Sequence, residues 1–311
     1  MSARSVEFLQ IEPTRHCNFH CLFCQGRFLP KAELETGVLK RALAGLEGVR
    51  YVEFQGEGEP FLYPGYFDAC RAILERFPGA EISTISNGST LVPSVRGKLA
   101  GGPVAHILVS METSDPDDFR FLRGGDLTQI LENVRELRAC ADGRPRVGLA
   151  VTVLRDRADQ LEKIVVLYDE LGLDGGISVQ YLQNMESYAS HYGPELAGST
   201  FAAREQAEFE RTHAAVLASV ARVNARDKAS FFYSRLFDGW SPADLSCPWL
   251  DHGAYLSADG TESPCCYIKD GRAMDRERLA DALAAGVVPP PCEGCFVARE
   301  VKAAGLALSS F

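Results

Sequence analysis

The sequence carries little positive charge for its length and lacks long apolar runs. Its 32 lysine and arginine residues are outnumbered by 42 aspartate and glutamate residues, which gives a net charge of −10. Nucleic acids and anionic membranes bind basic surfaces, so this balance disfavours both as partners. No run approaches the ~18 uninterrupted apolar residues of a spanning helix, and no signal-peptide core stands near Met1. We therefore expect a cytoplasmic protein.

Disulfide bonds are not expected either, although the chain has 10 cysteines among 311 residues. Thiols stay reduced in the cytoplasm, so a high cysteine count there points to metal binding. Cys70 and Cys140 fall in helical patterns and are read as structural thiols. The apolar fraction of 46% is enough to bury a sizeable core in one large domain or two.

Three cysteines stand together near the N-terminus. Cys17, Cys21 and Cys24 have the spacing C-x3-C-x2-C. A [4Fe–4S] cluster normally takes four thiolates, so three ligands leave one iron open to a small molecule. Zinc sites more often pair C-x2-C with a second pair or with histidines. The spacing therefore favours an iron–sulfur cluster with an open iron.

Strand and helix patterns alternate along the first 185 residues. The predicted strands are residues 6–11, 51–54, 82–85, 105–109, 147–153 and 177–182, and the predicted helices are 34–46, 66–77, 127–140 and 159–171. Asp126 is the expected N-cap of the third of these helices. This order predicts an α/β fold, a partial (β/α)6 TIM-like barrel. Functional residues of such barrels lie at the carboxyl ends of the strands. The cysteine loop, residues 56–60, Asn87 and residues 110–112 all follow predicted strands.

On these residues the chain resembles the radical S-adenosylmethionine (SAM) superfamily. Cys17, Cys21 and Cys24 match its cluster motif, and residues 56–60 resemble its G-G-E-P loop, which binds the SAM amino group largely through backbone carbonyls. The resemblance covers residues 5–185. It implies a [4Fe–4S] cluster and SAM as cofactors, and a 5′-deoxyadenosyl radical that abstracts hydrogen from carbon.

The resemblance also implies SAM contacts at the strand ends. Phe23 is the aromatic residue before the third cysteine, Ser110 and Arg123 fall where ribose and carboxylate contacts occur, and Arg155 follows the fifth strand. Solvated loop charges are the other interpretation of the two glutamates in residues 56–60. The expected cofactor-binding residues are Phe23, Gly56, Glu57, Gly58, Glu59, Asn87, Ser110, Arg123 and Arg155.

A second group of cysteines lies in the last 70 residues. Residues 253–257 and 261–265 read as strands of a hairpin around the turn Asp259-Gly260. The hairpin brings Cys247 near Cys265, and the C-x2-C pair Cys292 and Cys295 completes four ligands. Four thiolates suit zinc or iron–sulfur. Behind a radical SAM barrel the pattern resembles a SPASM domain of the short twitch form, which implies one auxiliary [4Fe–4S] cluster.

These patterns divide the chain into three parts. Residues 1–185 are the expected radical SAM barrel, and residues 186–240 are a helical connection with one long helix over 201–227. Residues 241–311 are the expected small iron–sulfur domain, a β-hairpin plus helix.

A fully ligated second cluster suggests an electron acceptor. The arrangement resembles the dehydrogenases of aminoglycoside antibiotic biosynthesis, which oxidise a secondary alcohol of a cyclitol or amino sugar. This resemblance implies a small-molecule substrate and an external one-electron donor such as flavodoxin or ferredoxin. Glu12, Glu112 and Tyr267 are the candidate bases.

Other outcomes stay open at this point. In an epimerase, Cys266 would return hydrogen to the substrate radical. Cys266 is otherwise a packed thiol, or the cluster ligand in place of Cys265. A ribosomal-peptide maturase is a third outcome, although we expect no leader-recognition domain before the first strand. A non-enzymatic electron carrier would need neither an open iron nor the loop at 56–60.

Overall fold

The structure is a computed structural model that describes residues 3–268 and 275–308. Within them, an eight-stranded sheet has the order β10-β9-β2-β4-β5-β6-β7-β8. All neighbouring strands are parallel except β10 and β9. A separate pair is formed by β1 and β3. The strands are β1 (Arg4–Ser5), β2 (Phe8–Ile11), β3 (Leu46–Glu47), β4 (Tyr51–Phe54), β5 (Glu81–Ser86), β6 (Val104–Ser110), β7 (Arg146–Val153), β8 (Ile177–Tyr181), β9 (Gly253–Leu256) and β10 (Glu262–Ser263).

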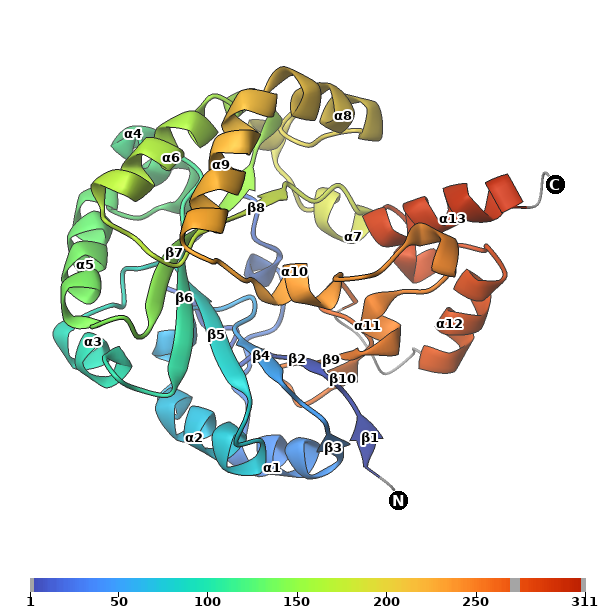
Figure 1. Cartoon of the computed structure of the whole chain (residues 1–311), viewed down its shortest axis with the longest axis horizontal. Coiled ribbons are helices and arrows are strands. Elements are labelled where there is room, and N and C mark those ends of the chain that lie inside the picture. The colour runs from blue at the N-terminus through green and yellow to red at the C-terminus, as the bar shows by residue number, and fades with distance from the viewer. Residues whose placement is uncertain (1–2, 269–274, 309–311) are drawn as a thin grey trace.

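Helices cover the outer side of this curved sheet, and a second group of helices gathers around the C-terminal segment (Figure 1). The first group is α1 (Thr36–Ala44), α2 (Tyr66–Arg76), α3 (Pro93–Leu99), α4 (Pro116–Arg123), α5 (Leu127–Cys140), α6 (Gln160–Glu170) and α9 (Ala214–Arg226). Helix α8 (Ala203–Thr212) lies beside α9. The second group is α7 (Glu186–Ala189), α10 (Phe232–Leu236), α11 (Pro248–Asp251), α12 (Arg276–Ala284) and α13 (Phe296–Leu308).

The six predicted strands are confirmed as β2, β4, β5, β6, β7 and β8. Their β-branched and aliphatic runs fit strands that are covered on both faces, as parallel strands usually are. The α5 boundaries agree with the prediction, because the Asp126 side chain accepts hydrogen bonds from the backbone N–H groups of Thr128 and Gln129. The α/β class and the partial barrel are confirmed.

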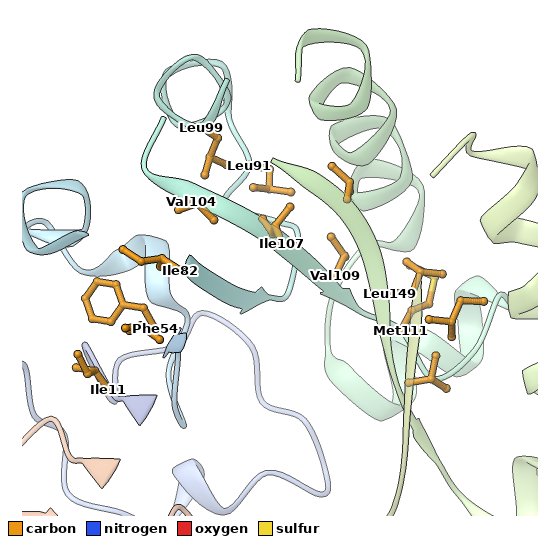
Figure 2. Close-up of a cluster of buried hydrophobic side chains, with 14 of the residues drawn as sticks. Ile11, Phe54, Ile82, Leu91, Leu99, Val104, Ile107, Val109, Met111 and Leu149 are labelled. Atoms are coloured by element: carbon orange, nitrogen blue, oxygen red, sulfur yellow. The ribbon is translucent and has the colours of Figure 1, made fainter. Parts of the chain in front are cut away.

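The core lies between the parallel strands and the outer helices. Figure 2 shows side chains of β2, β4, β5, β6 and β7 that point into this layer. Ile11, Phe54, Ile82 and Ile107 are fully buried there. These side chains fix the sheet, and the sheet in turn fixes the loops at its carboxyl edge.

Two helix predictions differ from the structure. The long helix expected over 201–227 is two helices, α8 and α9, that meet at His213. The Thr212 hydroxyl donates to the carbonyl of Glu208, and this competition for a helix acceptor favours a break. The helix expected over 34–46 is shorter, because Leu46 pairs with Arg4 in the small β1–β3 ladder.

The C-terminal segment extends the main sheet. The predicted hairpin is confirmed as β9 and β10, with Gly260 in the left-handed conformation that its turn requires. Strand β9 then pairs in parallel with β2, the strand that leads to the cysteine loop. The two cysteine regions are therefore attached to adjacent strands. The three-part division of the chain stays a prediction.

Ile107→Ala tests this core. Ile107 has no exposed surface, so the truncation should lower the free energy of unfolding by about 2–5 kcal/mol. Urea denaturation measures the change. Val166→Ala on α6 is the matched control, because Val166 is 54% exposed and its truncation should cost less than about 0.5 kcal/mol. Equal losses in the two variants would contradict the packing.

Candidate functional site

The three N-terminal cysteines line one cavity of about 260 Å³ at the carboxyl ends of the strands. The Phe19 N–H donates to Cys17 Sγ at 3.4 Å, and Arg123 Nη1 donates to Cys21 Sγ at 3.6 Å. The Asn87 amide lies 3.9 Å from Cys17 Sγ. N–H donors around sulfur are suited to thiolates rather than to neutral thiols.

Without a cation these thiols would stay protonated. Burial raises the pKa of Cys17, Cys21 and Cys24, and the neighbouring Glu57 carboxylate raises the pKa of Cys24 further. Metal binding reverses this by replacing the proton with a positive ion. The donor set of three neighbouring thiols, buried at Cys21 and half-buried at Cys17 and Cys24, therefore fits an iron–sulfur cluster.

The glycines at 56 and 58 allow the second loop to lie against the end of β2. A Cβ at Gly56 would stand 2.4 Å from Glu12 Cγ, and one at Gly58 would stand 2.4 Å from the Thr14 carbonyl. Only glycine therefore permits this approach without displacement of the neighbours. Residues 55–59 line the same cavity as the cysteines, a position compatible with the predicted SAM-binding loop.

The two glutamates of this loop are bonded within the protein. Glu57 accepts from the backbone N–H of Gly26 at 3.1 Å. Glu59 is buried and accepts from Ser86 Oγ, Thr90 Oγ1 and the Asn87 N–H at 2.7–2.8 Å. Both carboxylates hold neighbouring loops in place, so the interpretation as solvated charges does not apply to Glu59.

Glu112 and Arg123 form a buried bidentate ion pair. Arg123 donates to both carboxylate oxygens of Glu112, with Nη2 and Oε1 at 2.5 Å. The Arg123 guanidinium also lies 5.3 Å from the ring centre of Phe23. This pairing directs Arg123 towards Cys21 and occupies Glu112, so it gives Glu112 a positioning role. A role of Glu112 as base stays a prediction.

Glu12 is fully buried at the junction of three segments. Its Oε1 accepts from the Glu57 N–H at 3.0 Å, and its Oε2 accepts from Arg15 Nε at 2.9 Å and from the Ala258 N–H at 3.0 Å. Ser257 Oγ donates to the same carboxylate at 3.2 Å. These contacts give Glu12 a structural task, and a role of Glu12 as base stays a prediction.

Most other predicted cofactor residues also reach the cavity. Phe23, Asn87 and Ser110 line it. Arg155 does not, because its side chain donates to the Gly198 carbonyl at 2.7 Å and pairs with Glu205. The structure therefore places Arg155 on the α8 side of the protein, away from the other predicted SAM contacts.

The C-terminal cysteines gather around Cys247. Cys247 packs on one apolar cluster together with Cys265, and on a second together with Cys292 and Cys295. Burial raises the pKa of Cys247 to about 12, and the neighbouring Cys295 and Cys292 add to the increase. Burial also raises the pKa of Cys265, and the neighbouring Cys266 and Cys247 add to the increase. The four predicted ligands thus share one region of the structure.

No three His, Cys, Asp or Glu side chains surround a single ion-sized point within residues 3–268 and 275–308. A [4Fe–4S] cluster binds each thiolate through a different iron, so its ligands do not have to meet around one ion.

A second cavity of about 440 Å³ adjoins the first. Both are lined by residues 180–183 and by Tyr233, and the second is also lined by Tyr267. Tyr233 Oη lies 2.8 Å from Cys266 Sγ, and Cys266 itself is 5% exposed. The sequence patterns did not select Tyr233, which lies on the short helix α10 and has no neighbouring motif.

Glu53 is a further residue that the sequence analysis missed. It lies on β4 with 3% exposure, and burial raises its pKa to about 8. Burial raises the pKa of Tyr233, and the nearby Glu53 adds to the increase. The sequence could have pointed to Glu53, because Glu53 and Gln10 are polar residues inside apolar strands that are buried on both faces.

Comparison with known proteins agrees with this geometry. Residues 11–167 match the Radical SAM superfamily model, so the chain belongs to the radical SAM superfamily. Membership implies a [4Fe–4S] cluster and SAM, and the cysteine loop and residues 56–58 are the parts of this chain that fit them.

Individual relatives carry the comparison further. GTP 3′,8-cyclase 1 of Pseudomonas aeruginosa is 30% identical over 193 residues, which are 58% of this chain and 55% of the relative. GTP 3′,8-cyclase of Paracoccus denitrificans is 34% identical over 175 residues, which are 52% of this chain and 49% of the relative. The chain spans about half the length of these curated relatives.

Solved structures show the same fold at low identity. Native anSMEcpe with bound AdoMet has a TM-score of 0.62 at 16% identity, covering 95% of this chain and 88% of that one. Streptococcus suis SuiB bound to S-adenosylmethionine has a TM-score of 0.62 at 15% identity, covering 94% of this chain and 71% of that one.

The helices in the described part of the chain are all too short or too polar to cross a membrane.

Cys17→Ala tests the cluster assignment. Loss of one of three ligands should abolish reductive cleavage of SAM and lower the iron content by about four atoms per chain. Iron analysis and chromatography of 5′-deoxyadenosine measure both. Cys140→Ala is the matched control, because Cys140 is exposed on α5 and should retain iron and cleavage. Cleavage of SAM by Cys17→Ala would overturn the assignment.

The raised pKa of Glu53 predicts that the stability of the protein depends on pH. Its pKa is about 8 in the folded protein against an ordinary value of 4.5, so the folded state holds a proton that the unfolded state releases. The free energy of unfolding should fall by up to about 1.4 kcal/mol per pH unit as the pH rises between these values. Denaturation at pH ~6 and ~8 should show that the free energy of unfolding falls less with pH in Glu53→Gln than in the wild type. An equal fall in the two proteins would contradict the raised pKa of Glu53.

Proposed function

We propose that this radical SAM enzyme abstracts a hydrogen atom from a carbon of a small polar substrate and returns a hydrogen that originates from Cys266. The result is inversion of the carbon, an epimerisation. The observation that carries the proposal is the position of Cys266, which contacts Tyr233, a residue that lines both cavities.

The state of the cavity carboxylates supports this outcome over dehydrogenation. A dehydrogenase needs a base to take the proton of the alcohol. The carboxylates that line these two cavities already accept hydrogen bonds or form ion pairs. Glu57 accepts from the Gly26 N–H, Glu59 from Ser86, and Glu112 and Glu300 pair with Arg123 and Arg299. Burial also raises the pKa of Tyr267 well above its usual value, so that its phenol keeps its proton.

The remaining residues have separate tasks in this proposal. Cys17, Cys21 and Cys24 hold the first cluster, and Arg123 donates to Cys21 while Glu112 fixes its direction. The cluster and SAM, when bound, supply a carbon-centred radical. Residues 180–183 and Tyr233 form the wall against which the substrate is oriented.

Dehydrogenation of a secondary alcohol is the second candidate. The group of Cys247, Cys265, Cys292 and Cys295 favours it, because a second [4Fe–4S] cluster there would accept an electron close to the cavity. In both candidates Cys265 is the ligand rather than Cys266, since Cys266 Sγ already contacts Tyr233. The electron that starts each turnover would come from a carrier such as flavodoxin or ferredoxin.

Iron content tests the second cluster. Anaerobically reconstituted protein should bind about eight irons per chain, and a Cys292→Ala, Cys295→Ala double variant about four. The double variant should still cleave SAM, because its first cluster is intact. About four irons in the wild type would contradict a second cluster, and zinc found in their place would identify a different metal site.

Deuterium labelling tests the reaction itself. The enzyme is incubated in D2O with SAM, dithionite and a panel of cyclitols, amino sugars and GTP, the last because of the GTP 3′,8-cyclase relatives. Epimerisation predicts a product with one added deuterium at the inverted carbon, and Cys266→Ala should lose it. A product that is lighter by two hydrogens would establish dehydrogenation, and a cyclised nucleotide would contradict both candidates.

A further inference from the structure

Cys266 does not line either cavity in the described structure, although it lies close to both. Tyr233 lines both, and its hydroxyl contacts the thiol at 2.8 Å. We propose that Tyr233 relays the hydrogen atom, giving its own to the radical in the cavity and taking a replacement from Cys266. This inference rests on the proposed function and adds a second catalytic residue to it.

The hydrogen-bond chain gives the relay a direction. Gln10 Nε2 donates to the Gln55 carbonyl at 3.4 Å, which turns Gln10 Oε1 towards Tyr233. Tyr233 Oη donates to that oxygen at 3.3 Å. Either atom of the Tyr233–Cys266 pair could be the donor. With the Tyr233 hydrogen on Gln10, the phenol oxygen accepts the Cys266 S–H, and this is the arrangement that the relay uses.

The surroundings keep the pair in place. The Tyr233 ring packs edge-on against Phe232 at 5.6 Å and Trp249 at 6.0 Å between ring centres. Cys266 is buried in the same apolar cluster, with Phe8 and Tyr255. Tyr233 is the cavity-lining side chain that contacts this thiol, so it is placed to pass hydrogen between the thiol and the cavity.

The proposed steps balance in atoms and electrons. A carbon radical takes the hydrogen of the Tyr233 hydroxyl, so that a C–H bond forms and the O–H bond breaks. The phenoxyl radical takes the Cys266 hydrogen, so that the O–H bond forms again and the S–H bond breaks. One electron from a low-potential reductant and one proton from water restore the thiol.

SAM alone is the probe, so the test needs no knowledge of the substrate. In D2O the hydroxyl and thiol carry deuterium, and dithionite is the reductant. Without added substrate, the 5′-deoxyadenosyl radical in the first cavity should take this deuterium, giving 5′-deoxyadenosine with one added mass unit. In Tyr233→Phe the deuterated fraction should fall about tenfold. Tyr192→Phe is the matched control, because Tyr192 lines the same cavity but donates to the Gln183 carbonyl.

Electron paramagnetic resonance gives a second readout that a packing role would not produce. In Cys266→Ala the phenoxyl radical lacks its hydrogen donor, so a tyrosyl signal should accumulate. The signal should be absent from the double variant that carries both Cys266→Ala and Tyr233→Phe. An unchanged deuterated fraction in Tyr233→Phe, or no tyrosyl signal in Cys266→Ala, would overturn the relay alone. A wild-type protein that forms no 5′-deoxyadenosine would overturn the proposed function and the relay together.

Discussion

The buried carboxylate of Glu12 is the interaction on which the arrangement of the site depends. It joins the end of β2, the loop at residues 56–60 and the turn of the C-terminal hairpin through the donors Arg15, Glu57 and Ala258. Loss of one partner from a buried ion pair typically costs about 3–5 kcal/mol, because the other charge is left uncompensated. This connection holds the second cysteine region against the strand that carries the first.

A radical reaction needs walls that position groups and keep water out, more than it needs free acids and bases. The carboxylates around the first cavity fit this demand, because they fix loops and Arg123 and are themselves saturated with donors. Tyr233 lines both cavities and Cys266 contacts it from behind, and both side chains carry hydrogens that a carbon radical is able to take. The chemistry and the packing of the site therefore favour the same outcome.

Much of the fold could be predicted from the sequence, because strand patterns, the Asp126 cap and the Asp259-Gly260 turn depend on neighbouring residues. The cysteine loop was predictable for the same reason. The roles of Glu12, Glu59 and Glu112 were not, since their partners are brought to them by the folded chain. Arg155 failed to reach the cavity for a similar reason, because Gly198 and Glu205 lie beside it only in the tertiary structure.

An anaerobic crystal structure of the reconstituted protein with SAM tests the central claim most directly. The account predicts a [4Fe–4S] cluster on Cys17, Cys21 and Cys24, with SAM in the first cavity and the Tyr233 hydroxyl between its ribose and Cys266. Iron bound to Cys266, or a Tyr233 side chain turned away from SAM, would contradict it.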